Sequence, residues 1–345
     1  MLATTALALL ASALSVAGAP SLSLKVEGAA SVENIDNFKV NTVITNVGDE
    51  TLRILNDPNG PLSKLPANTF SITNSEGRPA AFNGIKVKYV PRVAAEVGAF
   101  TTLAPGASIT VAHDLSAAYN LTATGVDTYE VEPSSLFQIV GTNGEVSSLR
   151  ASVNKIHRAS IKGRLAKVRP TATLERRATY ISCSAARQTA LVSAASAAQT
   201  YALNSKNYLT GISAGTTRYN TWFGTYTSAR KSTVQSHFTA ISGNTFSSFT
   251  YDCSCTDSGT YAYVYANSPG KVYLCGAFWN APTTGTDSKG GTLVHEASHF
   301  TVNGGTDDHV YGQTGAKNLA ISNPANAVDN ADNHEYFAEN NPALA

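Results

Sequence analysis

The chain has 345 residues, of which 43% are apolar and only 14% are charged, and its formal net charge is +1. This length suits two domains or one large one, and the apolar fraction is ample for a hydrophobic core. A near-neutral chain lacks the strongly basic surface that attracts nucleic acids or acidic membranes, so we expect neither as a partner.

The first 19 residues, MLATTALALLASALSVAGA, are small and apolar. Ala17-Gly18-Ala19 fits a small-residue cleavage site, so we predict a signal peptide over residues 1–19 and a secreted protein. A membrane anchor is the alternative interpretation of this stretch. No later run of the sequence is long and apolar enough to span a bilayer, so we expect no membrane association once the signal is removed.

Residues 20–165 alternate between short strand-like runs and turn clusters. The runs include SLSLKVEG, FKVNTVITNV, TLRILND, IKVKYV, SITVAHDL and YEVEP, and turns such as NVGDE and NDPNG separate them. This pattern is typical of an antiparallel all-β sandwich. The segment has no cysteine, and Asn120-Leu121-Thr122 makes Asn120 a predicted glycosylation site.

A polar connector, TLERRATYISC, follows the strand-rich segment. It holds the dibasic pair Arg176-Arg177 just before the first cysteine, and proteolysis concentrates in such connectors. We therefore predict a processing site, with residues 20–177 as a propeptide and residues 178–345 as the mature domain. An ordinary exposed arginine pair is the alternative.

The sequence beyond residue 184 is helical in character. The alanine-rich run SAARQTALVSAASAAQTYALNS predicts a helix with Ser184 as its N-cap. One face of this helix carries Leu191, Ala195, Ala198 and Ala202. Further helices are predicted over SARKSTVQSHFTAIS, GTLVHEASHF and NADNHEYFAEN, and short tyrosine-rich strands over residues 245–280. These elements predict a mainly α-helical α+β domain.

The four cysteines, Cys183, Cys253, Cys255 and Cys275, all lie in the second half. In a secreted chain an even count predicts two disulfides, and four cysteines allow three pairings. Cys253 and Cys255 are too close in sequence to pair comfortably, so each is expected to pair elsewhere. A thiolate metal site at CSC is the rival interpretation, which an oxidising compartment disfavours.

Residues 295–299, HEASH, match the H-E-x-x-H pattern. On a helix, positions i and i+4 share a face, so His295 and His299 can bind one ion while Glu296 acts on a metal-bound water. A histidine pair on a solvated helix face is the alternative.

The motif does not fix the third metal ligand. The extended pattern HExxHxxGxxH is excluded, because Val302 and Gly305 stand where it needs glycine and histidine. Glu335 and Glu339 remain open, as does an aspartate of GGTDD, whose glycines allow the chain to turn back to the metal.

The segment HEASHF…GGTDDHVYG resembles the aspzincin signature, in which an HExxH helix precedes Gly-Thr-x-Asp-x-x-Tyr-Gly. The matching positions are Gly305, Thr306, Asp308, Tyr311 and Gly312. The resemblance implies a zincin-type catalytic domain with one Zn²⁺ per chain and Asp308, rather than Asp307, as third ligand. It also implies that Glu296 is the general base and that Tyr311 donates a hydrogen bond to the oxyanion, with His309 as a bystander.

A wider likeness covers CGAFWNAPTTGTDSKGGTLVHEASHF and NADNHEYFAENNP, which resemble the fungal peptidyl-Lys metalloendopeptidases of the deuterolysin-like group. This resemblance implies a layout of signal, propeptide and catalytic domain. It further implies the disulfides Cys183–Cys253 and Cys255–Cys275.

Asp332 and Glu335 are three residues apart on a predicted helix, so their carboxylates share a face. A solvated acidic face is the commoner meaning of such a pair. The resemblance instead places them in the pocket for a lysine on the amino side of the cleaved bond, and two carboxylates can hold a compact ammonium. We expect this pocket to be separate from the metal site, so that amide replacements leave zinc binding intact.

These features predict a two-domain secreted zinc endopeptidase, made as a zymogen and monomeric, that cleaves proteins or peptides before lysine and is restrained by its own propeptide. One alternative is an endopeptidase of the same class with broad or different specificity. Another is a β-sandwich binding protein with an inactive zinc domain, against which the intact set of His295, Glu296, His299, Asp308 and Tyr311 argues.

Overall fold

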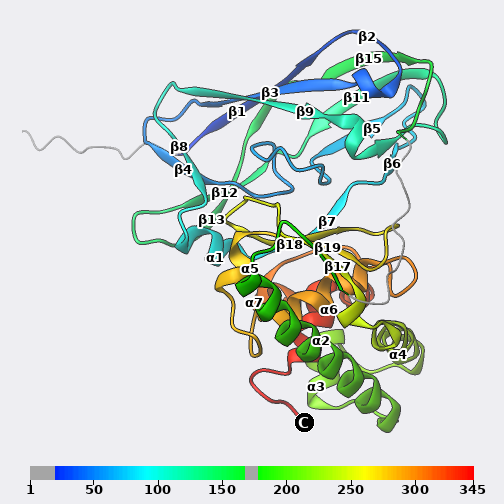
Figure 1. Cartoon of the computed structure of the whole chain (residues 1–345). Coiled ribbons are helices and arrows are strands. Elements are labelled where there is room, and N and C mark those ends of the chain that lie inside the picture. Colours follow the sequence, from blue (N-terminus) through cyan, green and yellow to red (C-terminus); the bar gives the residue numbers. More distant parts are fainter. Residues whose placement is uncertain (1–19, 168–177) are drawn as a thin grey trace, which may run out of the picture.

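The computed structural model describes residues 20–167 and 178–345. The predicted signal peptide and the Arg176-Arg177 pair lie outside these described residues. Within them, a strand-rich N-terminal half packs against a helix-rich C-terminal half (Figure 1). No helix in the described part of the chain has the length and apolarity needed to cross a membrane.

The N-terminal half is built almost entirely of strands. Its elements are β1 (Leu22–Gly28), β2 (Ser31–Glu33), η1 (Ile35–Asn37), β3 (Lys39–Asn46), β4 (Leu52–Leu55), β5 (Phe70–Thr73), β6 (Ala81–Phe82), β7 (Ile85–Tyr89), α1 (Pro91–Glu96), β8 (Phe100–Leu103), β9 (Ser108–Asp114), η2 (Leu115–Ala117), β10 (Tyr119–Asn120), β11 (Asp127–Pro133), β12 (Leu136–Val140), β13 (Val146–Arg150), β14 (Ser152–Lys155) and β15 (His157–Lys162). Five of the six strand-like runs in the sequence contain one of these strands, and the sixth, YEVEP, lies within β11.

These strands form small, mostly antiparallel sheets with the orders β14-β1-β3-β9, β2-β15-β11-β5, β13-β12-β4-β8 and β10-β6. Alternation explains their packing, because β1 buries Leu22, Leu24 and Val26 and turns the residues between them outward. The strand content therefore agrees with the predicted all-β half, although the strands divide among more sheets than a plain two-layer sandwich has.

The C-terminal half combines helices with a small sheet. Its elements are β16 (Thr179–Ile181), α2 (Ala185–Gly211), α3 (Thr217–Phe223), α4 (Ser228–Gly243), η3 (Phe246–Ser248), β17 (Thr250–Asp252), β18 (Thr260–Tyr265), β19 (Lys271–Leu274), α5 (Gly276–Asn280), α6 (Lys289–His299), α7 (Gly312–Ser322), α8 (Pro324–Val328) and α9 (Ala331–Glu339). The four predicted helices correspond to α2, α4, α6 and α9. The helices α3, α5, α7 and α8 were not predicted.

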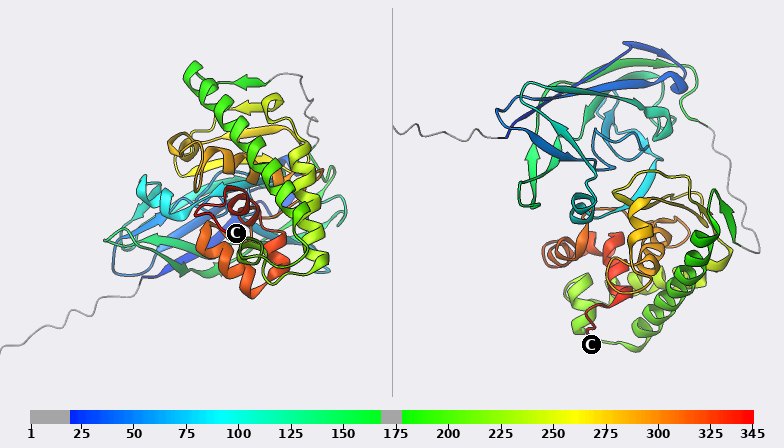
Figure 2. Two further views of the ribbon diagram at one scale, coloured as in Figure 1. Left: turned by 90° about the horizontal axis from the view of Figure 1, so that it is seen from below. Right: turned by 60° about the vertical axis from the view of Figure 1, so that its left-hand side comes forward.

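Helix α2 begins as its sequence predicts. The Ser184 side chain accepts a hydrogen bond from the Arg187 N–H, which caps the helix. The predicted apolar face is buried along its whole length, and α2 packs against α4 and α6 (Figure 2). The disulfides are Cys183–Cys253 and Cys255–Cys275, the pairings that the resemblance implies. The first ties the start of α2 to the end of β17, and the second ties the loop after β17 to the end of β19.

One strand of the N-terminal half is part of the sheet in the C-terminal half. The C-terminal sheet has the order β16-β17-β19-β18-β7, so its last strand comes from the N-terminal half. Strand β7 pairs antiparallel with β18 from Tyr89 opposite Thr260 to Ile85 opposite Tyr265, and both strands lie against α6 (Figure 1). The two halves thus share a sheet beside the HExxH helix.

Candidate active site and metal centre

Helix α6 carries His295, Glu296 and His299, and every residue of this helix is buried. Glycines at its start permit that burial. A Cβ on Gly290 would lie 2.8 Å from the Cβ of Ala197, so no larger residue fits between α6 and α2 without a shift. The helix is thereby held deep in the core, with its histidines directed toward the edge of the sheet.

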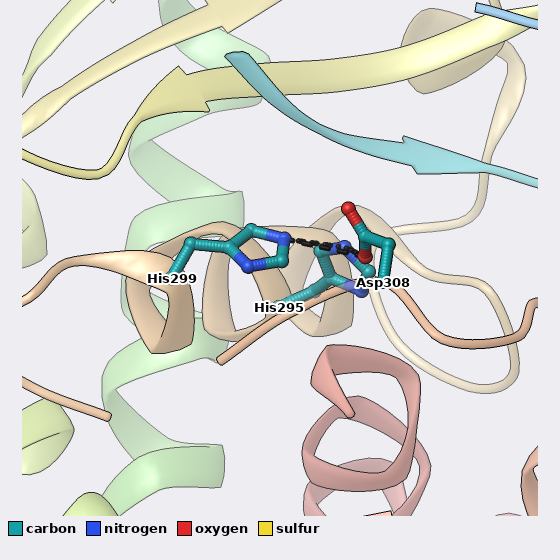
Figure 3. Close-up of side chains that lie close together, drawn as sticks. All are labelled: His295, His299 and Asp308. Carbon is teal, nitrogen blue, oxygen red and sulfur yellow. Dashed lines mark hydrogen bonds and ion pairs between the residues drawn. The ribbon is translucent and has the colours of Figure 1, made fainter. Parts of the chain in front are cut away.

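The imidazoles of His295 and His299 converge with the carboxylate of Asp308 (Figure 3). The two histidine Nε2 atoms are 3.1 Å apart, and Asp308 Oδ1 lies 3.2 Å from that of His295 and 3.4 Å from that of His299. A tetrahedral zinc ion with bonds of about 2.0–2.1 Å has ligand atoms about 3.3–3.4 Å apart. The triangle therefore has the size that a zinc site requires.

The other nitrogen of each imidazole is already engaged. His299 Nδ1 lies 2.8 Å from the carbonyl oxygen of Thr306, and His295 Nδ1 lies 2.9 Å from Asp332 Oδ1. The contact with the Thr306 carbonyl fixes the His299 tautomer that leaves Nε2 free to bind a metal, and the close approach of Asp332 orients the His295 ring. Among the described residues the buried Glu296 Oε2 has no hydrogen-bond partner, which suits a group that acts on a metal-bound water.

A tight turn after α6 returns Asp308 to the histidines. Gly305 has a φ of +60°, a conformation that glycine adopts without strain. The hydroxyl of Thr306 then lies 2.7 Å from that of Ser298 on α6, which anchors the loop to the helix. The neighbouring Asp307 points elsewhere and forms an ion pair with Lys86 Nζ at 2.6 Å. Geometry therefore favours Asp308 over Asp307 as the third ligand.

The two glutamates considered as ligands do not complete the triangle. Glu339 accepts hydrogen bonds from the backbone N–H and the hydroxyl of Ser288, both at 2.8 Å, at the start of α6. Glu335 Oε2 lies 3.3 Å from His295, but at Nδ1 rather than at the nitrogen that faces His299. His309 is also outside the cluster, since its Nε2 lies 2.9 Å from Asp329 Oδ2.

Tyr311, predicted to stabilise the oxyanion, precedes α7 and has partners from the N-terminal half. Its hydroxyl accepts a hydrogen bond of 2.9 Å from the Asn59 side-chain amide, and its ring packs edge-on against Tyr89. Burial raises the pKa of Tyr311 well above its ordinary value, and the nearby charge of Asp308 adds to the effect. The hydroxyl therefore keeps its proton and remains a donor.

Asp332 and Glu335 surround an ammonium group, and it belongs to Lys88 of β7. Lys88 Nζ lies 2.9 Å from Asp332 Oδ1 and 2.8 Å from Glu335 Oε2. Asp287 Oδ1 at 3.3 Å and the Tyr336 hydroxyl at 3.4 Å complete the cage. Sequence reasoning missed these two residues; Tyr336 is four residues after Asp332 on α9, a spacing that could have indicated it.

The charges of this cage compensate one another. Burial disfavours the ammonium of Lys88, whose side chain is 0% exposed, but Asp332 and Glu335 outweigh that effect and raise its pKa well above the ordinary value. Burial alone would raise the pKa of Asp332, but the positive charge of Lys88 lowers it below its ordinary value. The lysine and this aspartate are therefore both ionised in the buried pocket.

The expected separation of pocket and metal site is wrong. Asp332 Oδ1 lies 2.9 Å from both Lys88 Nζ and His295 Nδ1, so one oxygen touches the lysine and a metal ligand. An amide at this position would change the partner of His295, so we expect zinc binding to depend on this residue of the pocket.

A buried HExxH helix whose two histidines meet a third acidic ligand defines a zinc metallopeptidase. A family model described as lysine-specific metallo-endopeptidase, of the aspzincin family, matches residues 208–339. The peptidyl-Lys metalloendopeptidase of Grifola frondosa is 53% identical over 348 residues, which is 99% of this chain and 99% of the relative. The chain belongs to the aspzincin family and is a zinc metalloendopeptidase.

Two shorter matches concern about half of the chain. The peptidyl-Lys metalloendopeptidase of Pleurotus ostreatus is 68% identical over 168 residues, which is 49% of this chain and all of the relative. A solved structure described as a zinc peptidase from Grifola frondosa is 62% identical, covers 47% of this chain and 100% of its own, and has a TM-score of 0.47.

Replacing Asp308 by alanine should remove the third ligand. Loss of a residue that only hydrogen-bonds to a metal ligand lowers metal affinity by up to about 100-fold, so we expect the loss of a ligand itself to lower zinc affinity by more than that. Asp307→Ala is the matched control, because that carboxylate pairs with Lys86 instead. Zinc content after dialysis, measured by atomic absorption, checks this. Loss of zinc from the Asp307 variant alone would transfer the ligand role to that residue.

Glu296→Gln should retain zinc and lose hydrolysis by about 10²–10⁴-fold, because the amide cannot accept a proton from water. The variant keeps the size of the buried side chain, so folding should not change. Zinc content and the rate of peptide hydrolysis, measured on the same preparation, test this together. A variant that loses zinc in parallel with activity would make Glu296 part of the metal-binding set instead.

Proposed function

We propose that the chain is the precursor of a secreted endopeptidase that cleaves peptide bonds on the amino side of lysine. The observation that carries this proposal is the cage around Lys88 Nζ, because a lysine of the chain itself lies among the carboxylates of the candidate pocket. In the same residue the backbone N–H donates a 3.1 Å hydrogen bond to Glu296 Oε1. A lysine in this pocket therefore has its own amide nitrogen at the candidate catalytic carboxylate.

The chemistry follows from that placement. A zinc ion held by His295, His299 and Asp308 would supply an activated water and polarise the substrate carbonyl. Glu296 would accept the proton of the water and return it to the leaving nitrogen; the 3.1 Å hydrogen bond from the Lys88 N–H to Glu296 Oε1 supports this role. Tyr311, protonated and three residues after Asp308, would donate to the oxyanion.

The edge of β18 would hold the substrate backbone. β7 already pairs with this edge as an antiparallel strand, which is how an extended peptide adds to an exposed sheet edge. Backbone pairing gives affinity without regard to sequence, so the choice of residue would rest with the cage.

The cage suits lysine better than arginine. Four oxygens surround a single nitrogen at 2.8–3.4 Å, an arrangement that matches a compact ammonium with three donors. A planar guanidinium is wider and needs acceptors laid out along its fork. An endopeptidase of broad specificity would have no use for a buried pocket lined by three carboxylates.

Several features support the precursor layout of residues 1–19, 20–177 and 178–345. The Pleurotus ostreatus relative aligns over its full length with 168 residues, the number of residues from 178 to 345. All four cysteines lie after residue 177 and form disulfides, as expected in an oxidising, extracellular setting. Asn120, the candidate glycan site, lies half-buried in β10 of the propeptide.

A digest of an unbiased protein mixture, analysed by mass spectrometry, tests the specificity. We expect lysine at the N-terminus of the new peptides. Asp287→Asn should lower kcat/KM for lysine substrates by roughly 10–100-fold, the scale of one hydrogen bond to a charged group. Asp287 is the best choice in the cage because it does not contact His295, so zinc content should stay unchanged. New N-termini without a lysine excess would favour the broad-specificity alternative.

The proposed maturation predicts a mature N-terminus near Ala178 or Thr179. N-terminal sequencing of the active secreted protein measures this directly, and replacement of Arg176 and Arg177 by alanine should leave the precursor uncut. A fully active enzyme that still carries residues 20–177 would contradict the propeptide assignment.

A further inference from the structure

Strand β7 forms the edge of the sheet in the C-terminal half. It is part of the N-terminal half, yet its ladder partner in the structure is β18 of the other half. An alternating strand of sequence IKVKY would ordinarily direct its lysines to water, but Lys88 is 0% exposed. Burial of a lysine is stable only with compensating charges, and among the described residues those around Lys88 Nζ are Asp287, Asp332 and Glu335.

Residues of β7, together with Asn59, contact Glu296, Asp308 and Tyr311. The Lys88 N–H donates to Glu296, and the Val87 N–H donates to Asp308 Oδ2 at 3.0 Å. The Tyr89 ring packs on Tyr311, whose hydroxyl is bound by Asn59, also of the N-terminal half. The general base, the third metal ligand and the oxyanion donor are thus all engaged from one side.

We infer that β7 inhibits the precursor by mimicking a substrate, with Lys88 as the residue that occupies the lysine pocket. The Val87–Lys88 bond then lies where a scissile bond would lie, and an external substrate can neither pair with β18 nor insert its lysine. This inference rests on the proposed lysine specificity and adds to it the segment, and the single side chain, through which the propeptide restrains the enzyme.

Lys86 provides an internal control. It lies two residues earlier on the same strand and also forms an ion pair, with Asp307 at 2.6 Å. Its partner is about half exposed, so solvent screens that pair, whereas Lys88, Asp332 and Glu335 are all 0% exposed. Removing the charge of Lys88 should therefore weaken the hold of the propeptide far more than removing that of Lys86.

The test uses the full chain with Glu296→Gln, so that the enzyme cannot digest its own propeptide, and with a site for an unrelated sequence-specific protease in place of Arg176-Arg177. After this connector is cut, the dissociation constant of the two halves is measured by dilution and size-exclusion chromatography. Lys88→Met, which keeps the length of the side chain and removes its charge, should raise that constant by about 10–100-fold. Lys86→Met should change it by less than about fivefold.

A second experiment measures displacement of the propeptide by peptides from the cut complex that retains Lys88. Its result does not depend on whether a Lys88 variant folds. A peptide with an internal lysine should displace the propeptide, and the same peptide with methionine in that position should not. Equal dissociation constants for Lys88→Met and Lys86→Met, together with equal displacement by both peptides, would overturn the inference.

Failure of the proposed function would look different. If digest mapping of the mature enzyme shows lysine preference while Lys88 proves unimportant for propeptide binding, only the substrate mimicry is refuted. If digest mapping shows no lysine preference, the proposed specificity itself is refuted.

Discussion

The structure depends on a group of charges that is buried beside the HExxH helix and stable only as a set. An isolated ion in a protein interior costs several kcal/mol, so each member needs a partner of opposite charge or a donor. Asp332 is the common member, because its Oδ1 contacts both Lys88 and His295 while its Oδ2 accepts the Gly312 N–H at 2.6 Å. One carboxylate therefore connects Lys88, the candidate metal ligand His295 and the start of α7.

Local features of this arrangement could be predicted from the sequence because they depend on neighbours in the chain. Helix α6 and the convergence of His295 and His299 follow from the i, i+4 spacing, and the cap of α2 follows from Ser184. The third ligand could not be predicted from spacing alone, which left both glutamates and aspartates as candidates. Only the likeness to a known signature selected Asp308, and the turn at Gly305 gives the physical reason for that choice.

The position of β7 could not be predicted, because a two-residue period says which side chains share a face but not which strand lies alongside. The run IKVKYV was assigned to a sandwich of its own half, where its lysines would face water. Asp287 and Tyr336 were missed for a related reason: their role appears only when β7 brings Lys88 between them. Contacts between residues about 200 positions apart leave no periodic signal in the sequence.

An exposed strand edge offers the same hydrogen bonds to any extended peptide, including another copy of the chain. β7 covers the β18 edge, so the strand that we infer to block the substrate also keeps this edge from pairing with another chain. The pairing is antiparallel and sequence-tolerant, so by itself it would not favour one register. The buried cage does so, because sliding β7 by one residue would withdraw the Lys88 ammonium and leave two fully buried carboxylates, Asp332 and Glu335, without their cation. The interaction that would select lysine in a substrate is thus the one that fixes the register of the strand in its place.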